Sequence, residues 1–228
     1  SRCRARCRAA RRKRRHRQTG QASLRRAAIL LSDPSLSIML RIRSLFAGLV
    51  CALAVSAAAA AAPAPRVQFK TSMGNFTVEV YPDKAPKTVS NFLQYVKDGF
   101  YKGTIFHRVM DGFMIQGGGF TPDMKQKDTR PPVEIESKNG LKNDKYTIAM
   151  ARTMDPNSAT AQFYVNVVDN NMLNYPGQDG YGYTVFGKVV EGTDTIDKIK
   201  AVETTTRFPH QNVPVKPIVI ESATVVSK

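Results

Sequence analysis

Residues 106–120, FHRVMDGFMIQGGGF, constrain the fold of this chain more than any other stretch. They predict a β-hairpin with short apolar strands at residues 104–109 and 113–116, joined by a turn at residues 110–112. The three glycines that follow allow one backbone to approach another closely, or allow the chain to bend at the corner of a barrel. The fold is therefore expected to be organised around this hairpin.

Alternation along these strands indicates which side chains share a face. Side chains two positions apart point the same way, so Phe106 and Arg108 are expected on one face, and His107 and Val109 on the other. His107 is accordingly interpreted as a packed imidazole that faces away from Arg108. In the second strand the same rule groups Phe113 with Ile115, and Met114 with Gln116. A cation, apolar groups and an amide can thus converge on one concave patch.

The rest of the domain has the periodicity of a mainly β protein. Further strands are predicted at residues 67–71, 76–81, 147–152, 162–167 and 185–190, with closing strands within residues 218–226. Val89, Phe92, Leu93 and Val96 form one face of a helix that Gly99 ends, and Ile196 and Ile199 indicate a short second helix. Residues 121–145 are polar and rich in turn residues, and are interpreted as surface loops. Many short strands without repeated strand–helix–strand units favour an antiparallel barrel.

The formal net charge of +16 belongs to the start of the chain. Residues 1–65 hold 14 of the 34 Lys and Arg residues and one acid, which leaves 20 basic and 17 acidic residues for the remainder. Nucleic-acid binding by the domain is therefore not expected. Residues 1–38 are predicted to form a disordered basic segment. This segment is either a nucleic-acid-binding arm or an untranslated or mis-started stretch. We favour the second interpretation, because Met39 is a better translation start.

Residues 39–62 have the pattern of a secretory signal peptide. A basic start is followed by a short apolar core and then by a run of small residues with several A-x-A sites. The apolar core is shorter than the roughly 20 residues of a membrane span, so cleavage is favoured over an uncleaved anchor, with no stable membrane insertion afterwards. We expect a periplasmic protein with a linker at residues 63–66 and a domain at residues 67–228. All three cysteines, Cys3, Cys7 and Cys51, precede the predicted cleavage site.

Several classes of chemistry lack support in the sequence. There is no G-x-S-x-G nucleophile motif and no phosphate-binding P-loop, and the domain holds two histidines, His107 and His210, too few for a histidine-based metal site. No metal site is predicted. Covalent catalysis therefore has no candidate motif.

The quoted hairpin motif, FHRV and then FMIQGG, resembles the signature of the cyclophilins, a family of peptidyl-prolyl cis-trans isomerases. The string KAPKTVSNFLQY at residues 84–95 and the strands at residues 147–152, 162–167 and 185–190 match cyclophilin segments in the same order. The resemblance covers about residues 67–227. It implies a closed antiparallel eight-stranded β-barrel capped by two α-helices, no cofactor, and activity on proline-containing unfolded or folding polypeptides.

The resemblance also implies roles for individual residues. Arg108 would be the catalytic cation; Phe113, Met114 and Leu173 would form a pocket for the proline ring, and Gln116 and Gln162 would hold Arg108 and the substrate backbone. The remaining matched substrate-binding positions are Ala151, Arg152, Tyr164, Met172 and Tyr183.

Four of these positions depart from the pattern of many relatives. Arg152 stands where many carry Asn, and Tyr164 replaces a Phe of the pocket floor. Met172 and Tyr183 stand where eukaryotic members carry Trp and His, as in the bacterial periplasmic branch. Without the indole N–H donor we expect weak cyclosporin binding with isomerase activity retained.

The function expected from these observations is isomerisation of X-Pro bonds during the folding of exported proteins, by a monomer. A guanidinium can donate a hydrogen bond to the proline nitrogen as the peptide bond twists, which would lower the barrier. The alternative is a non-catalytic peptide-binding chaperone with the same barrel and groove. The presence of Arg108 beside a nearly complete pocket favours the enzyme.

Overall fold

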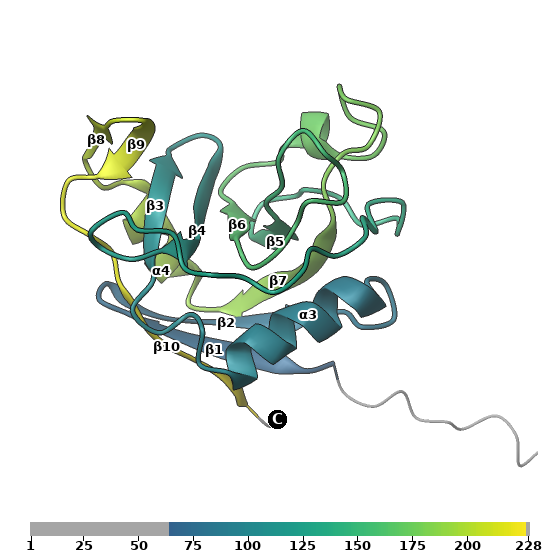
Figure 1. Ribbon diagram of the computed structural model, residues 1–228, viewed down its shortest axis with the longest axis horizontal. Coiled ribbons are helices and arrows are strands. Elements are labelled where there is room, and N and C mark those ends of the chain that lie inside the picture. The colour runs from purple at the N-terminus through teal and green to yellow at the C-terminus, as the bar shows by residue number, and fades with distance from the viewer. Residues whose placement is uncertain (1–63, 227–228) are drawn as a thin grey trace, which may run out of the picture. The chain divides into compact units, whose positions relative to one another are not determined.

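The computed structural model describes residues 64–226, so the predicted basic segment and signal peptide lie outside the described residues. The described part contains two α-helices, a 3₁₀ helix and ten strands (Figure 1). The helices are α3 (Pro86–Lys97), α4 (Thr193–Lys200) and η1 (Asn171–Leu173). The strands are β1 (Arg66–Thr71), β2 (Gly74–Val80), β3 (Ile105–Met110), β4 (Met114–Phe120), β5 (Thr147–Met150), β6 (Phe163–Asn166), β7 (Val185–Glu191), β8 (Thr204–Arg207), β9 (His210–Pro214) and β10 (Ile220–Val226). Arg66, which we had placed in the linker, begins β1 and forms an ion pair of 2.9 Å with Glu79.

Eight of the strands form one curled antiparallel sheet in the order β10-β1-β2-β7-β5-β6-β4-β3. The prediction of a mainly β fold with two helices is confirmed, but the prediction of a closed barrel was wrong, because the end strands β3 and β10 do not form a ladder. A single bridge between Ile105 and Val219 joins this seam, supported by a hydrogen bond of 2.7 Å from the Ile220 N–H to the Thr104 carbonyl. The sheet is thus an open, curled barrel.

The two faces of the sheet bury different groups, as the period of two requires. The inner face packs the main core, to which the central strands contribute Ile115, Ile148, Val165 and Phe186. Their immediate neighbours in the chain, Met114, Ala149, Tyr164 and Val185, form a second, smaller apolar cluster on the outer face. The outer cluster is the floor on which the site described below is built.

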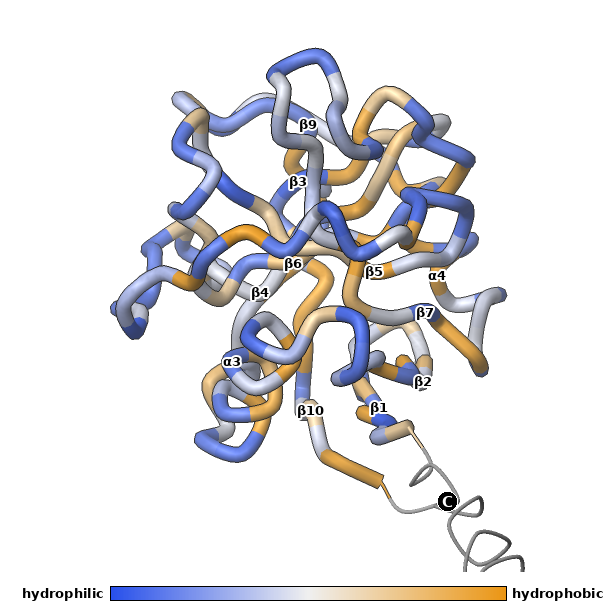
Figure 2. Tube along the Cα trace, turned by 90° about the vertical axis from the view of Figure 1, so that its right-hand side faces the viewer, coloured by the Kyte–Doolittle hydropathy of each residue, from blue (hydrophilic) through white to orange (hydrophobic). Residues whose placement is uncertain are grey.

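Aromatic rings fill the main core. Phe69 stacks on Phe76 with ring centroids 4.9 Å apart, and Phe92, Tyr101 and Phe163 surround Phe69 within 6.2 Å. Each fully buried ring contributes about 1.5–3 kcal/mol by its removal from water. Hydrophilic residues dominate the loops around this core, whereas apolar residues recur along the strands (Figure 2).

Helix α3 confirms the predicted helix, and its N-terminus depends on a distant loop. Pro86 occupies its first turn, and Ala85 at the N-cap provides no side-chain acceptor. The carboxylate of Glu136 accepts hydrogen bonds from the N–H groups of Lys87 (3.1 Å) and Thr88 (2.8 Å) instead. Gly99 follows the helix with φ +65°, the left-handed conformation typical of a helix terminus. The loop of residues 121–145 is therefore more than the surface excursion we had predicted.

The hairpin β8–β9 was not predicted. Its strands are short and mostly exposed, with the polar sequence TTTR in β8, so no apolar alternation indicates them. Helix α4, whose Ile196 and Ile199 are fully buried, was predicted. No helix within residues 64–226 is both long and apolar enough to span a bilayer.

Candidate active site

A β-bulge at His107 determines which side chains of β3 reach the site. Phe106 pairs with Gly117 and Arg108 with Gln116, so His107 is an extra residue in β3 with no partner position in β4. The predicted alternation was therefore wrong. Phe106 and Val109 both point into the main core, while His107 and Arg108 both line the same cleft.

Strand β4 presents Met114 and Gln116 to the site, as predicted, and Ile115 to the core. The grouping of Phe113 with Ile115 was wrong, because Phe113 lies in the turn before β4 and is not bound by the alternation of that strand. Its side chain packs against the outer apolar cluster and lines the pocket.

A pocket of about 110 Å³ lies over the outer apolar cluster. It brings together three residues predicted to hold a proline ring, Phe113, Met114 and Leu173, of which Leu173 comes from η1. Arg108 forms part of the same wall. The other lining residues are Gln116, Ala151, Arg152, Tyr164 and Tyr183. A guanidinium thus borders a small hollow lined by apolar and aromatic side chains together with polar groups.

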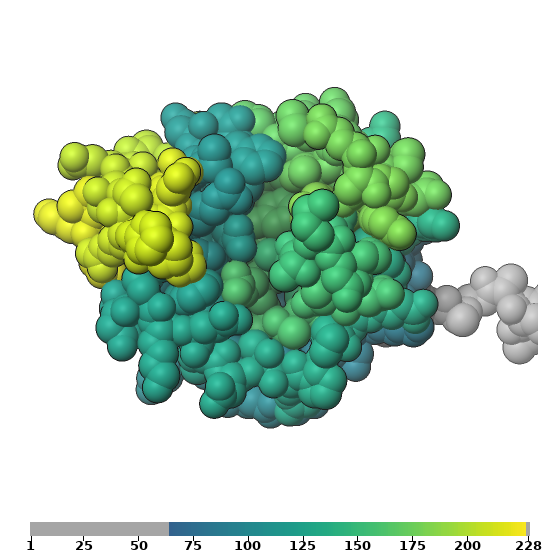
Figure 3. Space-filling view, turned by 45° about the horizontal axis from the view of Figure 1, so that its top comes forward, coloured from purple at the N-terminus to yellow at the C-terminus, as the bar shows by residue number. Residues whose placement is uncertain are grey.

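A larger cleft of about 550 Å³ shares Arg108 and Gln116 with the pocket. In Figure 3 the surface is hollowed between the β8–β9 hairpin, in yellow, and the green segments. Gln162 lines this cleft, and its side-chain oxygen accepts a hydrogen bond of 3.0 Å from the Gln116 amide. Gly119 permits this position, because a Cβ there would lie 2.4 Å from the Gln162 side chain.

The guanidinium of Arg108 makes no hydrogen bond or ion pair with any part of residues 64–226. The prediction that Gln116 and Gln162 hold it in place was therefore wrong, since the two amides bond each other instead. Five N–H donors of a permanently charged group remain available at the pocket wall.

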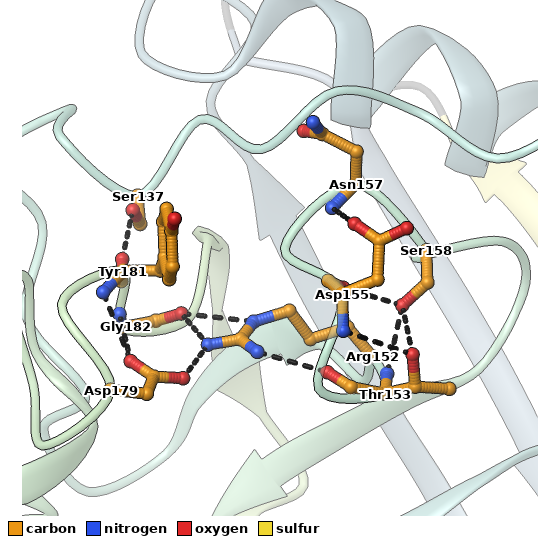
Figure 4. A network of polar contacts seen from close by, with 9 residues as sticks. All are labelled: Ser137, Arg152, Thr153, Asp155, Asn157, Ser158, Asp179, Tyr181 and Gly182. Atoms are coloured by element: carbon orange, nitrogen blue, oxygen red, sulfur yellow. Dashed lines mark hydrogen bonds and ion pairs between the residues drawn. The ribbon is translucent and has the colours of Figure 1, made fainter.

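Arg152, in contrast, is fully engaged (Figure 4). Its side chain is 3% exposed, and it donates to the carbonyl oxygens of Gly182 (2.7 Å from Nη2) and Thr153 (2.9 Å from Nη1). It also forms an ion pair with Asp179 and lies 4.3 Å from the ring centroid of Tyr183. The hydrogen bond from Arg152 holds the pKa of Asp179 well below its usual value, and two backbone N–H groups add to this effect. Arg152 therefore ties two loops together over the pocket.

The pocket floor is fixed by Tyr164. Its hydroxyl donates a hydrogen bond of 2.7 Å to the Asn143 side chain, and its ring makes an edge contact with Tyr183 at 5.9 Å. Burial raises the pKa of Tyr164 well above 10, so the phenol stays neutral. Ala151, which also lines the pocket, donates its backbone N–H to the Gln162 carbonyl at 3.0 Å, which ties this part of the pocket wall to the segment that carries Gln162.

Met172 is the predicted site residue that the structure places apart from the others. Its side chain is 57% exposed and lines neither the pocket nor the cleft. The reason is the short η1 helix, in which Leu173 turns toward the pocket and its neighbour turns outward.

Sequence reasoning missed the far wall of the cleft. His107 and Phe120 line it together with Pro209 and His210 of the unpredicted hairpin. The imidazole of His210 meets the Phe120 ring edge-on at 5.0 Å, and His107 lies 4.6 Å from the same ring. The polar end of β9 carried no signal for this position, because the contact depends on how the hairpin packs on β3.

His107 is electrostatically unusual. Its pKa is lowered to about 4, chiefly by burial and to a smaller extent by the nearby His210 and Arg108. Its Nδ1 atom is buried without a hydrogen-bond partner in the described residues. The imidazole is therefore neutral near pH 7. No three His, Cys, Asp or Glu side chains within residues 64–226 are grouped so as to hold a metal ion.

Comparisons with known proteins agree with this geometry. Residues 66–225 match the family model described as cyclophilin type peptidyl-prolyl cis-trans isomerase/CLD. The chain is 57% identical over 162 residues to peptidyl-prolyl cis-trans isomerase cyp18 of Streptomyces antibioticus, covering 70% of this chain and 98% of that protein. It is 56% identical over 161 residues to peptidyl-prolyl cis-trans isomerase B of Escherichia coli, covering 70% and 98%.

Among solved structures, a Cryptosporidium parvum cyclophilin type isomerase, crystallised in the presence of the dipeptide Ala-Pro, aligns with a TM-score of 0.62 at 27% identity. The alignment covers 72% of this chain and 99% of that one. The sheet, the pocket and these matches together lead to one assignment: this chain belongs to the cyclophilin-type peptidyl-prolyl cis-trans isomerases.

Proposed function

We propose that this isomerase catalyses X-Pro rotation at the pocket beside Arg108, with the Arg108 guanidinium as the catalytic group. The observation that carries the proposal is that this guanidinium borders a pocket of about 110 Å³, lined in part by Phe113, Met114 and Leu173, and has no partner within residues 64–226. A partnered arginine would first have to break a bond to reach a substrate. Arg108 is instead available at the place where a proline ring would be held.

The chemistry follows from the origin of the barrier. Rotation about a peptide bond costs about 18–20 kcal/mol because the C–N bond has partial double-bond character. In the twisted state the proline nitrogen regains its lone pair and can accept a hydrogen bond from Arg108. In the planar ground state that lone pair is delocalised, so the contact stabilises the transition state selectively.

The surrounding residues have complementary roles in this proposal. Phe113, Met114 and Leu173 hold the proline ring, so that the carbonyl side of the bond turns while the ring stays fixed. The Gln116–Gln162 amide pair borders both the pocket and the cleft, where it can bind the substrate main chain. Ala151, Arg152, Tyr164 and Tyr183 form the walls and floor. Met172, being exposed, contributes outside the pocket.

Substitution of Arg108 tests this role. Arg108→Ala should lower kcat/KM for an Ala-Pro tetrapeptide by about 10²–10³-fold, the loss typical when a transition-state hydrogen-bond donor is removed. Because Arg108 makes no bond within residues 64–226, the melting temperature should stay nearly unchanged. Peptide binding measured by NMR exchange should be retained. Full turnover in Arg108→Ala would refute the catalytic role, and binding without turnover in the unsubstituted protein would favour the chaperone alternative.

Export and the physiological role are proposed on the sequence pattern. Residues 39–62 would direct the chain to the periplasm, where it would act on folding exported polypeptides as a monomer. N-terminal sequencing of the mature protein tests export, since an N-terminus upstream of residue 39 would contradict it. Weak cyclosporin binding is expected because Met172 offers no N–H donor. A nanomolar inhibition constant would overturn that expectation.

A further inference from the structure

Three large apolar side chains next in the chain to residues of the site are exposed: Met154, Met172 and Phe208. They are 84%, 57% and 95% exposed, and within residues 64–226 no other Met or Phe is exposed to this degree. Each is the chain neighbour of a residue that lines the cleft or the pocket, namely Thr153, Leu173 and Pro209. They come from three separate segments of the chain. We call these three side chains the apolar rim.

Local contacts order the segments that carry two of the rim side chains, Met154 and Phe208. Met154 lies in a turn in which the Thr153 N–H and hydroxyl bond Ser158 Oγ at 2.9 and 2.8 Å, and Ser158 Oγ donates to the Asp155 carbonyl at 2.7 Å (Figure 4). Phe208 occupies the two-residue turn between β8 and β9. That hairpin is anchored by the contact of His210 with Phe120. Both side chains are thus held out in water by ordered structure, although burial would favour them.

The cleft beside these two side chains is polar, and its formally charged side chains are Arg108 and Arg152, of which Arg152 is paired with Asp179. Its lining is rich in amides and hydroxyls, among them Gln116, Gln126, Gln162, Ser158, Gln211 and Asn212. Such groups complement an extended main chain, which presents N–H and C=O groups without charge. A polar floor with apolar side chains at its edges is therefore suited to a polypeptide that lies along the cleft with its side chains directed outward.

We propose that the apolar rim is an extended binding surface for unfolded polypeptides. Met154 and Phe208 would pack against apolar residues of the substrate that flank the proline held in the pocket. The inference rests on the isomerase function, because the cleft is continuous with the pocket through Arg108 and Gln116. Methionine and aromatic side chains suit this task because they are enriched at binding surfaces and adapt to varied partners. The occupant is the same chain that supplies the proline, and specificity is for apolar flanking residues.

Matched peptides test the rim. Two unfolded 12-residue peptides would carry a central Ala-Pro, flanked on both sides either by Leu and Phe or by Ser, alongside an Ala-Pro tetrapeptide. The variant Met154→Ala/Phe208→Ala is compared with Val190→Ala, which removes an exposed apolar side chain on β7 that lines neither hollow. Isomerisation is followed by NMR exchange, and melting temperatures verify folding.

The double variant should lower kcat/KM for the apolar-flanked peptide by about tenfold, since each large side chain would lose partial burial against the substrate. The Ser-flanked peptide and the tetrapeptide should change less than about twofold, as should all three substrates with Val190→Ala. Equal losses for all peptides, or no loss for the apolar-flanked one, would overturn the proposal. So would a dimer in sedimentation analysis that the double variant abolishes. Failure of the unsubstituted protein on the tetrapeptide would instead refute the isomerase mechanism itself.

Discussion

Gly119→Ala is expected to disturb the site through a single steric contact. An added Cβ would lie 2.4 Å from Cγ, 2.7 Å from Cδ and 2.8 Å from Nε2 of Gln162, whereas ordinary contacts begin at 3.4 Å. The φ angle of Gly119 is outside the left-handed region, so the backbone itself accepts alanine. Because the obstructing group is a flexible side chain, the predicted response is a displacement of Gln162 by about 1 Å.

That displacement has a calculable cost. Moving Gln162 breaks its hydrogen bond with Gln116, which is worth about 0.5–1.5 kcal/mol net. Forcing the side chain off its rotamer adds about 0.5–1.5 kcal/mol. The free energy of unfolding should therefore fall by about 1–3 kcal/mol, and a loss of about 2 kcal/mol corresponds to a melting temperature lower by about 4–8 °C.

A double-mutant cycle isolates this contact. Urea unfolding is measured for Gly119→Ala, Gln162→Ala and the two combined, and kcat/KM is measured in parallel on an Ala-Pro tetrapeptide. In the Gln162→Ala background the Gly119→Ala change should cost less than about 0.5 kcal/mol, because the clashing atoms are gone. If Gly119→Ala is equally costly in both backgrounds, the reasoning from the Gln162 contact is refuted. Intact activity in Gly119→Ala would separately contradict a role for the amide pair.

Two further predictions concern charge at the site. The pKa of His107 is lowered to about 4 by burial and secondarily by His210 and Arg108, so the unfolded chain, titrating near 6.5, binds the proton first. Stability should hold above pH 6.5 and fall by up to about 3 kcal/mol as the pH drops toward 4. His107→Gln should lack this loss in urea unfolding at stepped pH, and parallel profiles would contradict the assignment. Arg152→Ala should lower the free energy of unfolding by about 2–4 kcal/mol, and Asp179→Asn should lower it clearly less. Only the first substitution leaves the Gly182 carbonyl and the Asp179 carboxylate without their shared donor. Equal unfolding free energies for these two variants would argue against the network.

Local pattern was sufficient for most elements of the fold. The helix α3 and strands such as β2 and β7 were predicted to within a few residues. The signals for them, the spacing of apolar residues and a glycine at the end of an element, lie within each segment itself. The family motif also identified the residues that meet in the pocket, including Arg108 and Phe113. Nine of the eleven predicted site residues line the pocket, and Gln162 lines the adjoining cleft.

Other features depend on contacts between distant segments. The bulge at His107 is a mismatch between two strands, so neither strand reveals it alone. Glu136 caps a helix about 50 residues earlier in the chain, and a polar hairpin completes the cleft wall. Whether Gln116 bonds Arg108 or Gln162 is decided by which group the fold brings within reach.

The amino-acid sequence by itself thus determined the type and order of the elements, the presence of an arginine beside apolar pocket residues, and the family. Only the tertiary structure decided that the sheet stays open, that His107 shares the cleft with Arg108, and that Met154 and Phe208 stand at its rim. The physical reason is that periodicity records which residues are buried along one segment, whereas register and juxtaposition arise from packing between segments.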